Sequence, residues 1–452
     1  MSEQKRGMHG IWTGRWTFIL AATGSAVGLG NLWKFPYITG ENGGGAFVLV
    51  YLACILLAGI PVMLAEALMG RKKRMSPINA MKELTTEAGS PNFFRGIGWM
   101  GALSGFFILS FYSVIAGWAL VYVGKLASGA MAGISADASG AAFGAMLADP
   151  VGLTVWHTLF MFFTGVVIAR GVNKGLESAL NILMPILFIL MLILFGYSLT
   201  TPGFMQGFRF LFDFDFSKLT TESIVVALGH SFFTLSLGMG AIMAYGAYMP
   251  AKQSLGKTIM WVGFLDTLVA LVAGMIIFAI VFSNGLEPSS GPGLMFVSLP
   301  IAFGTMPGGI FFGTVFFILV SIAALSSAIS IAEPAVAWAV EKGFTRVKAT
   351  IAICSVAWFI GLGTVLSFNE WAEYKLFGKT FFDSLDFVTS NVMLPLGGLL
   401  IAVFVGWFMS SDMIKSELKM KNDTLFAAWR FVLRFISPVA IALIFINGLG
   451  LL

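Results

Sequence analysis

Long apolar runs separated by short polar connections dominate the chain and predict its architecture. The runs are centred near residues 25, 58, 110, 160, 188, 235, 270, 322, 358, 398 and 438. Each holds about 20 largely apolar residues, which as an α-helix is long enough to cross the hydrocarbon core of a bilayer. The pattern therefore predicts an all-α polytopic membrane protein with about eleven transmembrane helices.

The first apolar run is interrupted at its middle. Residues 24–36 read GSAVGLGNLWKFP, with three glycines, an asparagine, a lysine and a proline. Glycine frees the backbone from helical angles, and proline removes a donor and disfavours helix in the residue before it. Unpaired backbone groups persist at membrane depth only where they are buried in protein or line a cavity. The stretch favours a broken helix whose free backbone groups face a ligand, although Gly24 and Gly28 also fit close helix packing.

The sixth apolar run is interrupted in a similar way. Residues 229–240 read GHSFFTLSLGMG, which is again polar and rich in glycine. Paired interruptions in the two halves of a chain indicate inverted repeats around a midplane binding site. We therefore expect a ten-helix inverted-repeat core within residues 1–424, with repeat one at about 10–200 and repeat two at about 221–411. An eleventh helix is expected over 425–452.

The basic residues add an orientation. The chain carries 27 lysines and arginines against 22 acidic residues. With a cytoplasmic N-terminus, 21 of the 27 fall on the cytoplasmic side, and six remain outside: Lys34, Lys125, Arg209, Lys218, Lys375 and Lys379. Cytoplasmic segments carry such an excess. We expect a plasma (inner) membrane protein with its N-terminus inside and its C-terminus outside, and no binding to nucleic acid.

Composition narrows the function classes. A hydrophobic content of 58% with only 11% charged residues excludes a soluble globule. Cys54 and Cys354 lie in apolar runs, which argues against a disulfide framework. With three separated histidines, the chain shows no spacing typical of a nucleophile–base pair or a metal cluster, so we expect no enzyme. A non-transporting amino-acid sensor stays open as an alternative.

Several motifs together resemble one family. Residues 24–36, followed by ENGGGAF at 41–47, are similar to the neurotransmitter:sodium symporters, and more closely to their bacterial amino-acid transporters. Further matches are GIPVMLAE at 59–66, FFTLSLG at 232–238 and AALSS at 323–327. The resemblance covers the first ten spans nearly end to end. It implies inverted five-helix repeats with broken first and sixth helices, in the eleven-helix form that many bacterial members share.

The resemblance also implies a site for a zwitterionic amino acid. The amides of Leu29 and Gly30 and the hydroxyl of Tyr112 would hold the carboxylate. The ammonium would meet the carbonyls of Ala26, Phe233 and Thr234 and the hydroxyl of Ser236. The pocket would be lined by Ser25, Val27, Ile108, Phe233, Ser236, Met239, Ser327 and Ile331.

The chemistry of this pocket points to a substrate class. Monoamine transporters of the family carry an aspartate where this chain has Gly28, so here the substrate should bring its own carboxylate. No charge in the pocket could pair with a charged side chain, whose unpaired burial is costly. We expect neutral, hydrophobic L-amino acids, aliphatic or aromatic. Small polar or osmolyte amino acids are the alternative.

Two sodium sites are implied as well. One resembles the Ala26 carbonyl with Asn31, Thr234 and Asp266, completed by the substrate carboxylate. The other resembles the carbonyls of Gly24, Val27 and Ala323 with the hydroxyls of Ser326 and Ser327. Oxygen-only sets of this kind suit a hard cation.

Asp266 departs from the bacterial leucine transporter, which has asparagine there. Chloride-dependent relatives place a serine one turn on, where this chain has Ala270. A carboxylate at the centre of a membrane helix costs on the order of 3 kcal/mol, which indicates a functional role. Our hypothesis is that Asp266 supplies the negative charge that chloride supplies elsewhere, so that no chloride is needed.

The gates follow from the same resemblance. Lys34 and Asp386 match an outer ion pair, and Trp12 matches an inner tryptophan. Glu341 matches an inner acidic residue whose usual basic partner is replaced by His9, with Arg6 as a possible substitute. Gly175 and Pro185 match a motif linked to unwinding of the fifth span, and Glu66 is expected to hold the broken part of the sixth.

Overall fold

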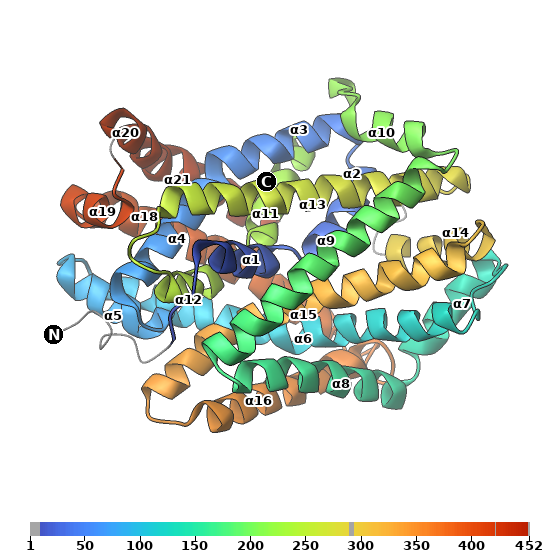
Figure 1. The fold of residues 1–452 in the computed structure, drawn as a ribbon, viewed down its shortest axis with the longest axis horizontal. Coiled ribbons are helices and arrows are strands. Elements are labelled where there is room, and N and C mark those ends of the chain that lie inside the picture. The colour runs from blue at the N-terminus through green and yellow to red at the C-terminus, as the bar shows by residue number, and fades with distance from the viewer. Residues whose placement is uncertain (1–9, 289–292, 421, 451–452) are drawn as a thin grey trace.

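Helices that run between two ends of the molecule make up the fold (Figure 1). The computed structural model describes residues 10–288, 293–420 and 422–450, and the only β-pairing in this part is an isolated bridge between Leu376 and Lys379. At one end lies helix α5 (Pro77–Glu87), and at the other lies α7 (Ala136–Leu147). We call these the α5 end and the α7 end.

Nine helices in the described residues are long and apolar enough to cross a membrane. They are Gly45–Lys73, Asn92–Ala127, Pro150–Ala169, Val172–Leu199, Leu255–Ser283, Gly309–Glu341, Arg346–Ser367, Phe381–Phe408 and Asp423–Gly448. Their main segments are α3 (Gly45–Cys54), α4 (Ile60–Lys73), α6 (Gly96–Ala127), α8 (Pro150–Ala169), α9 (Ser178–Leu199), α13 (Leu255–Ser283), α15 (Gly309–Glu341), α16 (Arg346–Ser367), α17 (Phe381–Asp386), α18 (Leu394–Val403), α20 (Asp423–Phe431) and α21 (Ser437–Gly448). The other two expected spans are the interrupted helices, so the all-helical, eleven-span prediction is confirmed.

The first interruption is narrower than the sequence suggested. Helix α1 (Arg15–Ala26) ends where Val27 adopts an extended backbone, with φ −70° and ψ 109°. A π-helical segment (Gly30–Lys34) then leads into α2 (Phe35–Glu41). Pro36 falls in the first turn of α2, where its missing N–H is not needed. Only residues 27–28 leave the helical path.

The second interruption is wider. Helix α11 (Thr221–Thr234) and helix α12 (Ala241–Tyr248) are separated by six residues. Three of them have positive φ: Ser236 (55°), Gly238 (77°) and Gly240 (74°). A Cβ on Gly238 would lie 2.6 Å from the Leu394 carbonyl oxygen, so this position needs glycine for space as well as for angle.

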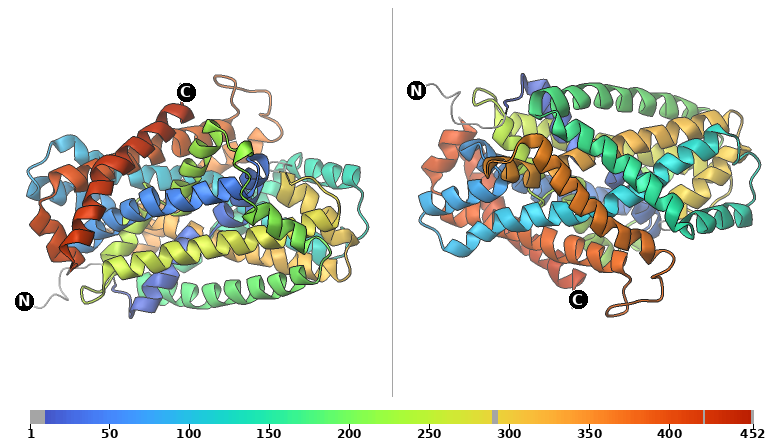
Figure 2. Two further views of the ribbon diagram at one scale, coloured as in Figure 1. Left: turned by 90° about the horizontal axis from the view of Figure 1, so that it is seen from above. Right: turned by 90° about the horizontal axis from the view of Figure 1, so that it is seen from below.

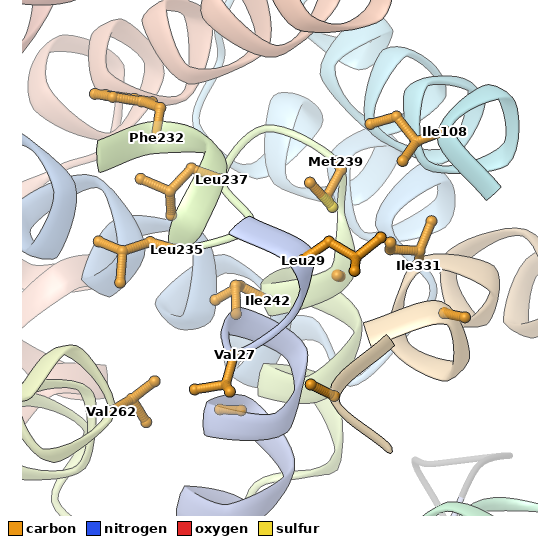
Figure 3. Packing of buried hydrophobic residues seen from close by; sticks show 14 of the residues in the cluster. Val27, Leu29, Ile108, Phe232, Leu235, Leu237, Met239, Ile242, Val262 and Ile331 are labelled. Carbon is orange, nitrogen blue, oxygen red and sulfur yellow. The ribbon is translucent and has the colours of Figure 1, made fainter. Parts of the chain in front are cut away.

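Both interruptions lie inside the bundle and face each other. Figure 3 shows Val27 and Leu29 beside Leu235, Leu237 and Met239. Helix α6 packs along α15, and α1 contacts α9, α13 and α15. Gly105 brings α6 close to α15, because a Cβ there would lie 2.9 Å from the Ile331 carbonyl oxygen. The long helices thus enclose the two breaks.

The connections contain more helix than the sequence indicated. At the α7 end, α7, α10 (Phe204–Phe212) and α14 (Leu299–Thr305) lie in the connections at about 125–150, 200–220 and 285–308, which the sequence predicts as loops. Ser139 ties α7 to the rest of that end by donating a hydrogen bond to the Val297 carbonyl oxygen at 2.9 Å. At the other end, α5 and α19 (Ser411–Leu418) are short helices, and Figures 1 and 2 show them at the same end of the molecule as α20.

Candidate functional site

A small cavity lies between the two breaks, α6 and α15. Its volume is about 20 Å³, and it is lined by Ser25, Ala26, Gly28, Leu29, Gly30, Ile108, Tyr112, Phe233, Ser236, Met239, Ser327 and Ile331. Of the residues predicted to bind substrate, all except Val27 and Thr234 line this cavity. Val27 is buried behind it, and Thr234 faces a neighbouring polar cluster. Gly28 is an additional lining residue.

One side of the cavity offers donors from the first break. The backbone N–H of Leu29 points to the Tyr112 hydroxyl oxygen at 3.4 Å. A Cβ on Gly28 would lie 2.5 Å from the Ser327 hydroxyl oxygen and 3.0 Å from that of Tyr112. A carboxylate-bearing side chain at Gly28 therefore has no room here. The amide and hydroxyl donors are left to meet a carboxylate that arrives with a ligand.

Another side of the cavity is formed by serine hydroxyls. Ser236 donates from its hydroxyl to the Ser25 carbonyl oxygen at 2.9 Å, and Ser327 donates to the same oxygen at 3.2 Å. Ser236 holds a left-handed backbone conformation in the second break, which is costly for a residue other than glycine. The hydrogen bond to Ser25 stabilises this conformation and joins the two breaks.

The remaining walls are apolar. Ile108 from α6, Met239 from the second break and Ile331 from α15 surround Leu29 in Figure 3. Among the described residues that line the cavity, none carries a charge. The site combines a small polar end with an apolar side-chain pocket, an arrangement common to pockets for small molecules.

Next to the cavity, three polar side chains gather from three helices. The Asn31 amide donates to an Asp266 carboxylate oxygen at 2.7 Å and to the Thr234 hydroxyl at 3.1 Å. The Thr234 hydroxyl donates to Asp266 at 3.1 Å. Asp266 is fully buried, and no basic side chain in the described part of the chain forms an ion pair with it. A buried carboxylate without a basic partner is costly, so this cluster suits a small hard cation.

A second set of oxygens joins α1 to α15. The Ser327 hydroxyl lies 3.4 Å from the Gly24 carbonyl oxygen and 3.1 Å from that of Val27. Ser326 donates to the Ala323 carbonyl oxygen at 2.9 Å. The helices approach closely at Gly24, where a Cβ would lie 2.9 Å from the Met184 sulfur. The residues predicted for two cation sites thus form two separate oxygen-rich groups.

At the α5 end, Trp12 is buried against α12. It is 1% exposed, its indole N–H donates to the Tyr245 carbonyl oxygen at 3.3 Å, and its amide donates to that of Tyr248 at 3.0 Å. Glu341 accepts hydrogen bonds from Ser76 and Asn79 and so holds α5. Arg6 and His9, considered as partners of Glu341, lie outside the described residues.

A further cluster at this end was not predicted. Glu333, fully buried in α15, forms an ion pair with Arg346 and accepts a hydrogen bond from the Tyr248 hydroxyl at 2.5 Å. Arg346 also donates to the Ile168 carbonyl oxygen at 2.9 Å. An acidic residue inside the apolar run 309–341 was a signal that could have identified Glu333.

At the α7 end the expected ion pair is apart. The Lys34 ammonium lies 4.5 Å from the centroid of the Phe233 ring, and Asp386 accepts a hydrogen bond from Ser390 at 2.8 Å. Among the described residues, no salt bridge joins Lys34 to Asp386. Glu66 accepts a hydrogen bond from the Gly238 amide at 3.1 Å, as expected for a residue that holds the second break.

The fifth span is wound in this structure. Its first turn is π-helical (Val172–Glu177), and Pro185 lies inside α9. A Cβ on Gly175 would clash with the Val167 carbonyl oxygen, so glycine is required for this close turn. A π-helical turn and an internal proline, here eight residues apart, are both features at which helices bend or depart from regular geometry.

Comparison with known proteins assigns the chain to a class. The model of the sodium:neurotransmitter symporter family matches residues 9–132 and 146–451. The chain belongs to this family, as the motifs had indicated. It is a sodium-dependent, multi-pass membrane transporter and not an enzyme, which confirms the expected class.

Individual relatives span the whole chain. It is 40% identical to the uncharacterized sodium-dependent transporter YhdH of Bacillus subtilis over 100% of both chains. It is 25% identical to the sodium-dependent serotonin transporter of Drosophila melanogaster, over 96% of this chain and 75% of that one. The crystal structure of MhsT in complex with L-phenylalanine matches with a TM-score of 0.89 and 42% identity, over 97% of this chain and 100% of that chain.

Proposed function

We propose that this protein couples sodium to the symport of neutral, hydrophobic L-amino acids by alternating access, without chloride. The observation that carries the proposal is the cavity between the two breaks. It has amide and hydroxyl donors on one side, the Ser236 and Ser327 hydroxyls on another, and apolar walls without charge. A zwitterion with an apolar side chain satisfies all three parts.

The pocket favours apolar over polar side chains. Ile108, Met239 and Ile331 offer no hydrogen-bonding partner beyond a weakly accepting thioether, so burial of a polar side chain there would cost free energy. Methionine adapts its shape readily, which suits both aliphatic and aromatic substrates. The MhsT structure with bound L-phenylalanine supports this choice. An amino acid with a small polar side chain is the alternative.

The size of the cavity implies movement. At about 20 Å³ it has room for roughly one water molecule, which is far less than an amino acid needs. Substrate binding therefore requires Phe233 and the segment around Met239 to move outward from Leu29. Phe233 is only half-buried and sits under Lys34, so it is the wall that can move with the least loss of packing.

Two sodium ions fit the two oxygen-rich groups. The first would contact Asn31, Thr234, Asp266 and the Ala26 carbonyl, beside the place where the substrate carboxylate would lie. The second would be held by the carbonyls of Gly24, Val27 and Ala323 and the hydroxyls of Ser326 and Ser327. Both groups bridge α1 to other helices, so an ion at either one stabilises a particular position of α1. A ligand shifts a conformational equilibrium only by such differential binding.

Alternating access would use the two ends in turn. The N-terminus and the α5 end would face the cytoplasm, as the basic residues indicate. Closure of Phe233 and Lys34 over the substrate would shut the α7 end. Release of Trp12 and unwinding between Gly175 and Pro185 would then open the α5 end and hydrate the second sodium site.

The first test is binding of labelled Leu, Trp, Tyr, Gly, Ala, GABA and dopamine to the purified protein, in sodium or potassium, with and without chloride. We expect sodium-dependent, chloride-indifferent binding of Leu or an aromatic amino acid. Preference for Gly or GABA would refute the hydrophobic substrate class. Binding without transport into proteoliposomes would favour the sensor alternative.

A second test concerns the charge of Asp266. If this carboxylate replaces chloride, Asp266→Asn should bind substrate weakly in chloride-free sodium buffer and recover in part when chloride is added. The matched control is Asp137→Asn, which removes an exposed carboxylate from the first turn of α7. An Asp266→Asn variant that binds and transports as the wild type does without chloride would refute this role.

A further inference from the structure

Glu177 is a buried carboxylate at the α5 end that the proposed function leaves unused. It is the last residue of the π-helical first turn of the fifth span, and it is 4% exposed. Its partners come from the N-terminal segment and from its own turn. One oxygen accepts from the amide of Thr13 at 3.2 Å and also from the Thr13 hydroxyl.

The other oxygen of Glu177 extends the connection. It accepts a hydrogen bond from the side-chain amide of Asn173 at 2.7 Å. The same side-chain amide donates to the Ile11 carbonyl oxygen at 2.8 Å. Gly10 packs so closely on Asn173 that a Cβ there would clash. No basic side chain in residues 10–288, 293–420 and 422–450 forms a salt bridge with Glu177. Its charge is therefore stabilised by neutral donors that are lost if the segment leaves.

The helix that follows Glu177 reaches the second cation site. Leu180 and Met184 of α9 lie against Gly24, where a Cβ would approach their side chains to 3.1 Å and 2.9 Å. The same Cβ would lie 3.3 Å from Ser326. A continuous path of contacts thus runs from the N-terminal segment through Glu177 and α9 to Gly24.

We propose that Glu177 is a positioning residue that latches the N-terminal segment (residues 10–14) to the π-helical turn, and thereby keeps α9 wound against the second sodium site. The inference rests on the sodium assignment of the proposed function. Release of Thr13 would leave the Glu177 carboxylate without two of its donors at a turn already weakened by its π-helical form. That loss favours unwinding of the turn and entry of water to Gly24.

The test is backbone hydrogen exchange of the full-length protein in detergent, in sodium and in potassium, for wild type, Glu177→Gln and Glu222→Gln. Hydrogen bonds to a charged group contribute more than neutral ones, so we expect about tenfold faster exchange in residues 10–14 and 172–177 of Glu177→Gln in either salt. Glu222 is an exposed carboxylate in the first turn of α11, and its variant should exchange like the wild type.

A second readout separates a latch from a general structural role. Glu177→Gln should raise the sodium concentration for half-maximal substrate binding by several-fold, and Thr13→Val should add little to this effect because both act on one contact. Fully additive effects, or wild-type exchange in Glu177→Gln, would overturn the latch. If the wild type itself ignores sodium, the sodium assignment has failed, whereas the exchange comparison in potassium still decides whether the latch exists.

An independent observation concerns the outer surface of the α5 end. A groove of about 980 Å³ runs between α4, α13 and α20. Its floor and walls include Ile60, Leu64, Trp261, Phe264 and Trp429. Lys257 and Lys419 lie in the same groove, together with Asn422. The groove is therefore mostly apolar, with two cationic side chains in its lining.

Neither lysine has an acidic partner among the residues that the structure describes. The nearby carboxylates are already paired, Glu417 with Arg71 and Asp423 with Lys415. Among the described residues, no carboxylate lies within salt-bridge distance of Lys257 or Lys419, and Lys419 donates only to the Ala251 carbonyl oxygen at 3.0 Å. Basic pockets between membrane helices on the cytoplasmic side bind anionic lipid headgroups.

The geometry points to an anionic phospholipid as the occupant of this groove, with an acyl chain between α4 and α13 and its phosphate at Lys257 and Lys419. This assignment uses the proposed orientation, which places the groove in the cytoplasmic leaflet. A lipid there would contact both α13, which carries Asp266, and α4, which carries Glu66.

Thermal unfolding in nanodiscs of phosphatidylcholine alone, or with phosphatidylglycerol added, tests this site. Phosphatidylglycerol should raise the unfolding temperature of the wild type and of Lys82→Gln/Lys348→Gln, which removes two exposed basic residues of the same end outside the groove. It should have no effect on Lys257→Gln/Lys419→Gln. An equal response of the two double variants, or none in the wild type, would overturn the assignment.

Discussion

The two ends of the molecule are closed by different chemistry. At the α5 end, Trp12 is buried against α12, and the carboxylates of Glu333, Glu341 and Glu177 are each engaged by two or more donors. At the α7 end, the Lys34 ammonium lies over the ring of Phe233, which lines the cavity, and within the described residues the Asp386 carboxylate accepts a hydrogen bond only from Ser390. Buried polar networks hold the α5 end closed, whereas the α7 end is covered by the weaker contact between Lys34 and Phe233.

This difference has an energetic meaning. Breaking a buried ion pair by removing one partner costs about 3–5 kcal/mol, whereas a partly exposed cation–π contact is worth about 0.5–1 kcal/mol. The α7 end can therefore open and close with little cost, while the α5 end needs several contacts to break together. Under the proposed orientation, this asymmetry favours a conformation that admits substrate from the α7 end and opens the α5 end only after the site is filled.

Among the substitutions at the two ends, Trp12→Ala should have the largest effect on how readily an end opens. Removal of a buried tryptophan costs about 3–5 kcal/mol, and here the loss falls on the closed form of the α5 end. We expect a cysteine introduced by Thr23→Cys in α1, in a chain without Cys54 and Cys354, to become reactive from the α5 end. Trp16→Ala is the control, because Trp16 is 64% exposed. Equal reactivity in both variants would mean that Trp12 does not close this end.

A smaller but still large effect is expected from Glu333→Gln. It leaves Arg346 without its charge partner while the Tyr248 hydroxyl keeps an acceptor, so the loss should be about 3 kcal/mol. The unfolding temperature should fall, and Thr23→Cys should react faster. Adding Arg346→Gln should restore part of the stability, because no charge is then left unpaired. A double variant less stable than Glu333→Gln would show that Arg346 acts through Ile168 instead.

The contrast between the ends also explains what the sequence could and could not predict. The two breaks were readable because glycine, proline and polar residues inside apolar runs act locally, as at Gly28 and Gly238. The pocket residues followed from the motif match, since Leu29, Ser236 and Ser327 stand in stretches that resemble the family. The length of each break could not be predicted from the sequence. The first break is only two residues long, because the Asn31 side chain accepts a hydrogen bond from the backbone amide of Gly28 and the helix resumes directly after it.

The sequence did not predict the buried polar contacts of the α5 end, for a different reason. Glu333 with Arg346, and Glu177 with Thr13, are pairs of residues that meet only after folding, and no local pattern marks the partner. Helix α7 was missed because its alanine and glycine content predicts no face for packing, and its bond from Ser139 to Val297 is likewise a tertiary contact. The separation of Lys34 from Asp386 depends on conformation, which a motif does not encode.

The smallest predicted effect lies at the α7 end. Lys34→Gln removes the cation above Phe233 and should speed substrate dissociation by roughly two- to fivefold, in line with about 0.5–1 kcal/mol. Lys34→Arg should slow dissociation, because a guanidinium can cover the ring and also offer a two-pronged contact to Asp386. The dissociation rate of a labelled amino acid, chased with unlabelled ligand in sodium, measures both effects.

Asp386→Asn tests whether Lys34 stays on the Phe233 ring or pairs with Asp386 when substrate is bound. If Lys34 stays on Phe233 throughout, Asp386→Asn should leave the dissociation rate unchanged, and Lys34→Arg should lose its advantage in the Asp386→Asn background. If Asp386→Asn instead speeds dissociation as much as Lys34→Gln, the two residues must pair once the cavity is filled. The α7 end would then gain an ion pair only in the closed state, and the asymmetry between the ends would belong to the state seen here.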